Sequence, residues 1–132
     1  MLMSINIRKW LSYISFPNCV VKHNGCSIPT IWVESTNLTA SYYKGYLGFK
    51  IILRNPMKRN CPILIIKNLN MVLIKPIDTN KPINNQRLTL YLRRIDIEYS
   101  QLSRRVWVVK PMINNDFLVK DCNGIEIAYN TN

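Results

Sequence analysis

Apolar residues in this chain of 132 residues occur in short runs, each about the length of a β-strand, with turn-forming residues between them. The run Ile63–Ile66 is typical, because Pro62 precedes it and Asn68 follows it closely. A transmembrane helix needs about 20 consecutive apolar residues, and no run approaches that length. Since 48% of the residues are hydrophobic, the chain can still bury a core. The pattern therefore predicts a folded, strand-rich protein without a membrane span.

The first half of the chain predicts two helices and a meander of strands. Ser35 or Thr36 supplies the N-cap of the second helix, and Leu38 and Tyr42 form its apolar stripe. The expected elements are a helix over 4–15, a strand over 26–32, a helix over 35–44 and strands over 48–54, 62–67 and 71–77.

The second half follows a polar segment, residues 78–86, which contains Pro82 and predicts a linker. The elements expected beyond it are a strand over 87–92, a helix over 95–102, a strand over 106–110, an irregular stretch over 111–116 and a strand over 124–129. No internal repeat is evident in the sequence. We therefore predict an α+β protein: an N-terminal α/β lobe with a three-stranded meander over 1–77, the linker, and a β-rich C-terminal lobe over 87–132.

The charge balance is strongly basic, with 18 Lys and Arg against 7 Asp and Glu, a formal net charge of +11. Such an excess causes self-repulsion unless a polyanion relieves it. Nucleic acid is the first candidate and an anionic membrane surface the second, while a merely basic domain needs no such partner.

Residues suited to catalysis or metal binding are few. The single histidine is His23, and the cysteines, at positions 19, 26, 61 and 122, lack Cys-x-x-Cys spacing. Zinc sites usually draw four ligands from two close pairs, so we expect buried free thiols and no metal. The acids are scattered, and Glu126, inside the last strand, is expected to face solvent. The sequence therefore predicts no enzymatic activity.

Basic residues alternate with aromatic ones in two clusters of the second half. The first cluster contains Arg87, Tyr91, Arg93 and Arg94, and the second contains Arg104, Arg105, Trp107 and Lys110. Strand alternation would place Arg105 beside Trp107 and turn Val106 and Val108 toward the core. Arginine binds phosphate and stacks on bases, so both clusters are candidate RNA contacts. The alternative is a solvated basic strand edge that deters aggregation.

Several segments, taken in chain order, carry a resemblance to a known family. They are Leu11–Ile14 with Ser27–Pro29, Lys44–Ile51, Lys81–Tyr91, Val106–Val109, and Asn123–Tyr129. Together they resemble the eighth protein of the small ribosomal subunit, in its bacterial and organellar form. Where that family has a Ser-Thr-Ser-x-Gly turn, this chain has Lys110–Asn114.

The resemblance implies a structural ribosomal protein that binds the central domain of small-subunit ribosomal RNA beside neighbouring small-subunit proteins. It implies no cofactor, no membrane and no small-molecule substrate. Glu126 matches an RNA-facing position of the family in type, and Lys110, Asn114 and Asn115 match in location only. With the two basic clusters, the predicted RNA-binding residues are Arg87, Tyr91, Arg93, Arg94, Arg104, Arg105, Trp107, Lys110, Asn114, Asn115 and Glu126.

The composition suggests where such a protein would act. Lys, Asn and Ile share A/T-rich codons and are abundant, whereas alanine occurs only at Ala40 and Ala128. With no signal peptide or Arg- and Ser-rich presequence evident, we expect an organelle-encoded protein of the mitochondrial matrix. Two alternatives are a basic accessory subunit of an organellar respiratory complex and a small RNA-processing enzyme. The scarcity of acid–base residues argues against the enzyme.

Overall fold

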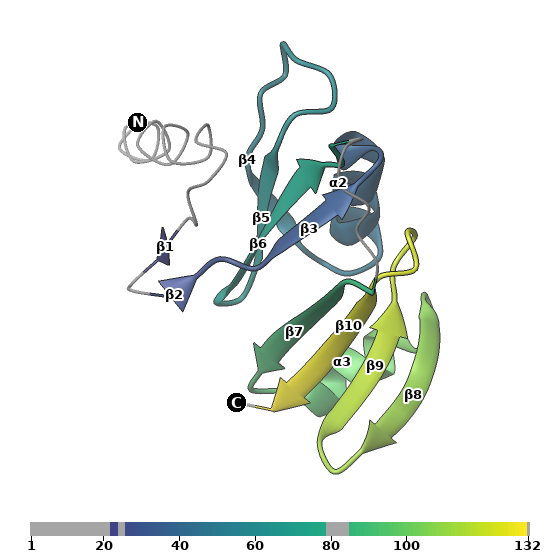
Figure 1. The fold of residues 1–132 in the computed structure, drawn as a ribbon. Coiled ribbons are helices and arrows are strands. Elements are labelled where there is room, and N and C mark those ends of the chain that lie inside the picture. Colours follow the sequence, from purple (N-terminus) through teal and green to yellow (C-terminus); the bar gives the residue numbers. More distant parts are fainter. Residues whose placement is uncertain (1–21, 24–25, 79–84, 132) are drawn as a thin grey trace.

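The computed structural model describes residues 22–23, 26–78 and 85–131, and the structural statements below concern these residues (Figure 1). The helix predicted over residues 4–15 lies outside them. The elements are β1 (Lys22–His23), β2 (Cys26–Ser27), β3 (Thr30–Val33), α2 (Thr36–Gly45), β4 (Lys50–Leu53), β5 (Ile63–Lys67), β6 (Asn70–Pro76), β7 (Arg87–Leu92), α3 (Ile95–Leu102), β8 (Trp107–Ile113), β9 (Asp116–Lys120) and β10 (Glu126–Thr131).

Two four-stranded sheets of identical topology form the body of the molecule, while β1 and β2 pair as a separate two-stranded sheet. The first sheet has the order β3-β6-β5-β4, with β3 parallel to β6 and the other pairs antiparallel. The second has the order β7-β10-β9-β8, with β7 parallel to β10. Each sheet is built from a strand, a helix and three more strands, so the fold is a βαβββ unit repeated twice.

This repeat corrects two predictions from the sequence. The predicted N-terminal α/β lobe followed by a β-rich lobe is wrong, because both units have the same helix and strand content. The structure contains an internal repeat, although none is evident in the sequence. The segment 78–86 falls between β6 and β7 and lies largely outside the described residues, so the division into two domains with a linker stays a prediction.

Several local predictions are confirmed and others are not. Ser35 caps α2, since its Oγ accepts a hydrogen bond from the Leu38 amide, and α3 covers the predicted range 95–102. However, the predicted apolar stripe of α2 is only half right, because Tyr42 packs against the core while Leu38 is 73% exposed. The core also receives Thr39 and Tyr43 from the other side of this helix.

The largest local error of the sequence prediction concerns the hairpin of β8 and β9, because residues 111–116 were expected to be irregular. Asn114 and Asn115 both have positive φ, 54° and 61°, and join the two strands in a tight turn. Asparagine tolerates this left-handed conformation, and two successive residues of this kind fit the twist of a hairpin. Pro111 lies on β8, an edge strand, where a missing N–H is tolerated.

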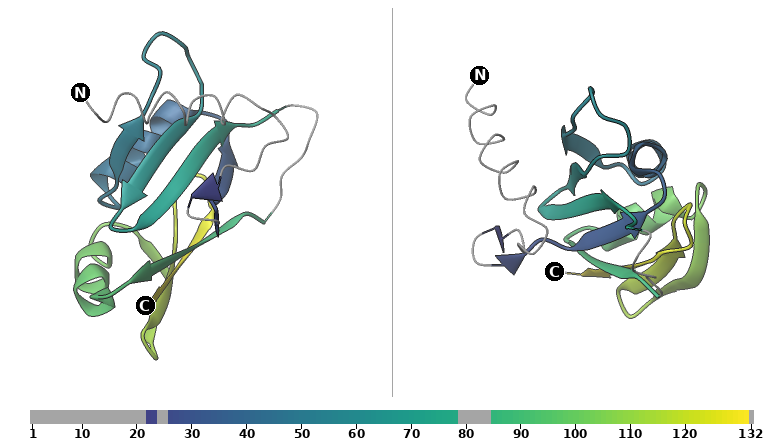
Figure 2. Two further views of the ribbon diagram at one scale, coloured as in Figure 1. Left: turned by 90° about the vertical axis from the view of Figure 1, so that its left-hand side faces the viewer. Right: turned by 45° about the horizontal axis from the view of Figure 1, so that its top comes forward.

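The apolar faces of both sheets bury their side chains in one common core. In Figure 1, α3 lies behind the second sheet, and the left view in Figure 2 shows α2 behind the first sheet. Alternate strand residues face these helices: Ile63 and Ile65 in the first sheet, Leu88 and Leu90 in the second. One face of each sheet therefore packs against a helix, and no helix of the described residues covers the other face.

Buried and partly buried polar contacts hold the two units together. The Tyr43 hydroxyl of α2 donates a hydrogen bond to Asp121 Oδ2 in the β9–β10 turn at 2.6 Å. Burial, together with the adjacent Asp121 carboxylate, raises the pKa of Tyr43. The Gln86 side-chain amide pairs with both the N–H and the C=O of Trp32, so it continues the edge of β3 toward β7.

We predict that Tyr43→Phe lowers the free energy of unfolding by about 1–3 kcal/mol, because it leaves a buried carboxylate oxygen without its donor. The matched control is Tyr129→Phe. The Tyr129 hydroxyl is equally buried and has no hydrogen-bond partner among the described residues, so its removal should be neutral or slightly stabilising. Urea denaturation of both variants tests the difference. Equal effects of the two substitutions would contradict this account of the unit interface.

Candidate functional site

The face of the second sheet opposite α3 carries polar, charged and aromatic side chains. On β7, Leu88, Leu90 and Leu92 are buried in the core, and strand alternation therefore turns Arg87 and Tyr91 to the opposite face. We call this surface the open face of the second sheet.

Four residues of the open face stand in one row across all four strands. The register pairs Arg87 on β7 with Glu126 on β10, Glu126 with Lys120 on β9, and Lys120 with Trp107 on β8. Three strand spacings separate the ends of this row, which is about 14 Å long. The sheet therefore assembles a cation, an anion, a second cation and an aromatic ring side by side.

The charged side chains of this row add up to a net positive charge. Arg87 and Lys120 flank Glu126, and like-charged neighbours are avoided along the whole row. The Lys120 ammonium lies 4.9 Å from the centre of the Trp107 ring, a cation–π contact. Trp107 is nevertheless 65% exposed, so much of its surface is free to contact another molecule.

A pocket of about 450 Å³ opens beside the row. Its described lining residues are Asn85, Gln86, Arg87, Lys120, Asn123, Gly124, Ile125 and Glu126. Asp121 fixes the β9–β10 wall, since its Oδ1 accepts hydrogen bonds from the amides of Asn123 (2.7 Å) and Ile125 (2.9 Å). The Asn123 side chain in turn donates to Thr39 Oγ1 of α2 at 2.9 Å. The helix of the first unit therefore braces the pocket of the second.

The structure gathers five of the eleven predicted site residues on the open face and disperses the other six. The five are Arg87, Tyr91, Trp107, Lys110 and Glu126. Arg93 and Arg94 precede α3, Arg104 and Arg105 follow it, and Asn114 and Asn115 form the β8–β9 turn. That these eleven residues bind a ligand stays a prediction.

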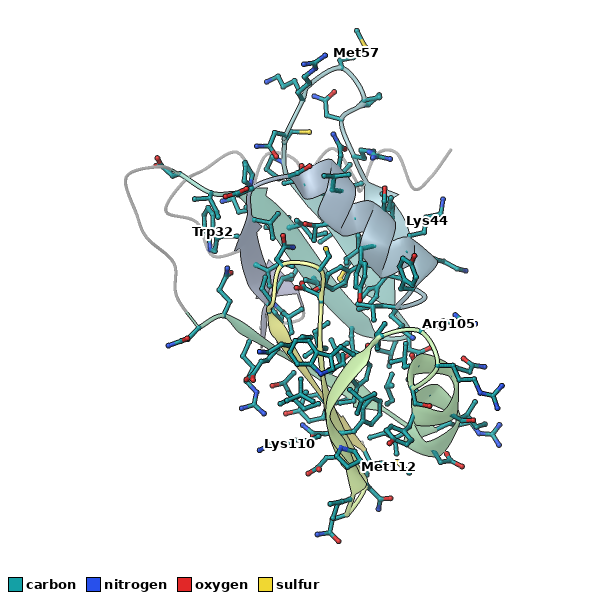
Figure 3. The ribbon with its side chains drawn as sticks, turned by 90° about the vertical axis from the view of Figure 1, so that its right-hand side faces the viewer. Trp32, Lys44, Met57, Arg105, Lys110 and Met112 are labelled. Atoms are coloured by element: carbon teal, nitrogen blue, oxygen red, sulfur yellow. The ribbon has the colours of Figure 1, made fainter. Side chains whose placement is uncertain are left out.

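The predicted pairing of Arg105 with Trp107 is wrong. Arg105 lies in the turn before β8, where its charge adds to the effect of burial in lowering the pKa of Lys67 in the first unit. Figure 3 shows Arg105 near α3 and Lys110 on the other side of the second sheet. The expectation that Val106 and Val108 face the core is confirmed, since both pack against the common core.

Sequence reasoning missed Lys120, Asn123 and Gln86. Lys120 ends β9, which was not predicted, so its position beside Trp107 could not be inferred. The Asn114-Asn115 pair was the available signal for that hairpin. Gln86 and Asn123 gain their roles from contacts with distant segments, for which no local signal exists.

The described residues contain neither a metal-ligand cluster nor a membrane-spanning helix. Within these ranges no three His, Cys, Asp or Glu side chains gather closely enough to hold a metal ion. The helices described here are too short and too polar to cross a bilayer.

Comparison with known proteins identifies the fold. No protein-family model and no curated protein sequence matches the chain. Several solved structures, however, match the chain. One is a bleomycin-binding protein from Streptomyces verticillus, solved with copper(II)-bleomycin (14% identity, 85% of this chain and 98% of that chain, TM-score 0.66).

Two further structures agree with the first. A lactoylglutathione lyase from Agrobacterium tumefaciens is 12% identical over 83% of this chain and 96% of its own, with a TM-score of 0.63. A member of the glyoxalase/bleomycin resistance protein/dioxygenase superfamily from Sphaerobacter thermophilus is 17% identical over 81% of this chain and 98% of its own, with a TM-score of 0.62. The chain therefore has the fold of this superfamily.

The fold overturns the ribosomal interpretation. The resemblance to the eighth protein of the small ribosomal subunit is wrong, and so are the partners it implied, ribosomal RNA and ribosomal proteins. The expectations of a structural role in the ribosome and of a mitochondrial location rested on the same resemblance and are also wrong. The exclusion of a small-molecule ligand is wrong too, because a protein of this fold is named for binding bleomycin. The fold occurs both in a named enzyme and in a named binding protein.

We predict that Glu126→Lys destabilises the protein by about 0.2–1 kcal/mol, because it places three cations in adjacent register positions. The effect should shrink at high salt, where exposed charges are screened. Glu34→Lys, a charge reversal at an exposed position outside the row, is the matched control. Urea denaturation of both variants at low and high salt provides the measurement. A Glu126→Lys effect no larger than the control's would show that the row is not electrostatically coupled.

Proposed function

We propose that this chain binds a small organic molecule with a planar apolar part and an anionic group, and that it does not chemically transform that molecule. The observation that carries the proposal is the row Arg87–Glu126–Lys120–Trp107 beside a pocket of about 450 Å³. Pockets for small molecules usually measure about 300–1,000 Å³ and combine an apolar surface with a few placed polar groups.

The chemistry of the row supports this ligand class. Arg87 offers a planar guanidinium that can bind a carboxylate through two hydrogen bonds, and Lys120 adds a second cation. Trp107 offers an exposed ring for a planar group to stack on. Glu126 accepts a hydrogen bond from a ligand hydroxyl or amine, which would fix the orientation of the bound molecule.

Binding without catalysis is favoured by the composition of the described pocket lining. It contains one carboxylate, two cations and three amides. A second carboxylate or a histidine within reach of Glu126 would be needed for the usual pairing of a general acid with a general base. The side chains present serve recognition, as expected of a binding protein.

The test is a titration with 2-naphthoate, a planar carboxylate, and with its neutral analogue 2-naphthamide, followed by calorimetry. We expect naphthoate to bind more tightly. Arg87→Ala should weaken naphthoate binding about ten- to hundredfold, as for loss of a hydrogen bond between charged groups, and should affect naphthamide little. Trp107→Ala should weaken both probes about tenfold.

Two exposed residues away from the open face provide matched controls. Arg104→Ala removes a guanidinium beyond α3, and Tyr46→Ala removes an exposed ring after α2. Neither should change the affinity for naphthoate. If Arg87→Ala and Trp107→Ala bind both probes like the controls do, or if neither probe binds the unaltered protein, the proposed function is wrong. Turnover of a bound ligand would contradict the absence of catalysis.

A further inference from the structure

A second pocket, of about 490 Å³, lies at the other end of β7. It is formed where the β5–β6 turn of the first unit meets the β7–α3 connection and the first turn of α3. Its described lining residues are Asn68, Leu69, Tyr91, Leu92, Arg93, Arg94, Ile97 and Glu98. Tyr91 lies four residues beyond Arg87 on β7, about 13 Å along the strand, so this pocket is distinct from the first.

The walls of this second pocket are held in place from both sides. The Asn70 side chain accepts a hydrogen bond from the Tyr91 amide at 3.0 Å and donates one to the Tyr91 carbonyl at 2.9 Å. Lys67 of β5 forms an ion pair with Glu98 of α3, and both side chains are largely buried. Burial, and to a lesser extent the charge of Arg105, lowers the pKa of Lys67 to about 8, so Lys67 is protonated at neutral pH. The pocket is therefore preformed.

Apolar side chains exposed to water line the pocket. Leu69 is 87% exposed, Tyr91 52% and Ile97 42%, and they come from three different segments of the chain. Asn68 has a positive φ of 54°, which forms the tight turn that presents Leu69. A ligand that covers these side chains gains the free energy of removing apolar surface from water.

Two arginines add an unbalanced positive charge at the rim. Arg93 and Arg94 are exposed, and neither forms an ion pair within the part of the chain that the structure describes. The only acid in the described lining is Glu98, which Lys67 already neutralises. Within the described pocket lining, no carboxylate therefore neutralises Arg93 and Arg94, so both can bind an anionic group of the ligand.

We propose that this second pocket binds an apolar molecule carrying one carboxylate, such as a medium-chain fatty acid, with the carboxylate at Arg93 and Arg94 and the apolar body against Leu69, Tyr91 and Ile97. A second copy of the chain is a poorer occupant. A symmetric contact through this surface would bring the arginines of both copies together within a protein of net charge +11.

The experiment is an NMR titration of the isotope-labelled full chain with decanoate and with neutral decanamide. We expect decanoate to shift the amides of Leu69, Arg94 and Ile97, and to bind about tenfold more tightly than decanamide. Ile97→Glu should weaken decanoate binding at least about tenfold. An acid in the first turn of a helix favours the helix, so this variant should keep its fold. The double substitution Arg93→Gln with Arg94→Gln should reduce decanoate affinity to that of decanamide.

The controls are matched in residue type. Ile113→Glu alters an exposed isoleucine at the end of β8, and Arg104→Gln alters an exposed arginine beyond the other end of α3. Neither should change decanoate affinity. Absence of decanoate binding, unchanged affinity in Ile97→Glu, or shifts confined to Arg87, Lys120 and Glu126 would each overturn the proposal. The last outcome would leave the proposed function of the first pocket intact, so the two proposals fail separately.

Discussion

The common core under both helices is the constraint on which the rest of the molecule depends. Successive strand residues point to opposite faces, so burying Leu88 and Leu90 against α3 forces Arg87 and Tyr91 to the other side. The same burial sets the register between strands, because a shift of one residue would turn the buried apolar side chains toward solvent. The row of Arg87, Glu126 and Lys120 follows from that register.

The two units also depend on each other for the shape of the pockets. Tyr43 of α2 donates to Asp121, which in turn holds the β9–β10 turn that lines the first pocket. Asn70, in the first sheet, clamps the end of β7 beside the second pocket. The first pocket therefore lies on the second unit and is braced by the first, whereas the second pocket is formed by residues of both units. A βαβββ unit alone would lack these contacts.

The ribosomal interpretation failed for a physical reason that the structure makes clear. Over the described residues, the predicted order of helices and strands was largely right, and the excess of cations is real. Local order does not determine which strands pair, however, and a basic surface serves an anionic small molecule as well as a nucleic acid. One missed hairpin, at Asn114 and Asn115, was enough to hide the repeat. With β9 in place, the second half has the same strand–helix–three-strand order as the first.

The sequence by itself determined the local features of this protein: a cap of α2 at Ser35 or Thr36, the range of α3, the exposure of Arg87 and Tyr91 on β7, and the net positive charge. These depend on residues close together in the chain, whose periodicity and capping are readable without a structure. Only the tertiary structure decided that Glu126 lies beside Arg87 and that Tyr43 reaches Asp121, 78 residues away. Those neighbours are selected by the packing of two sheets around one core, and no periodicity within a single segment encodes the pairing of distant strands.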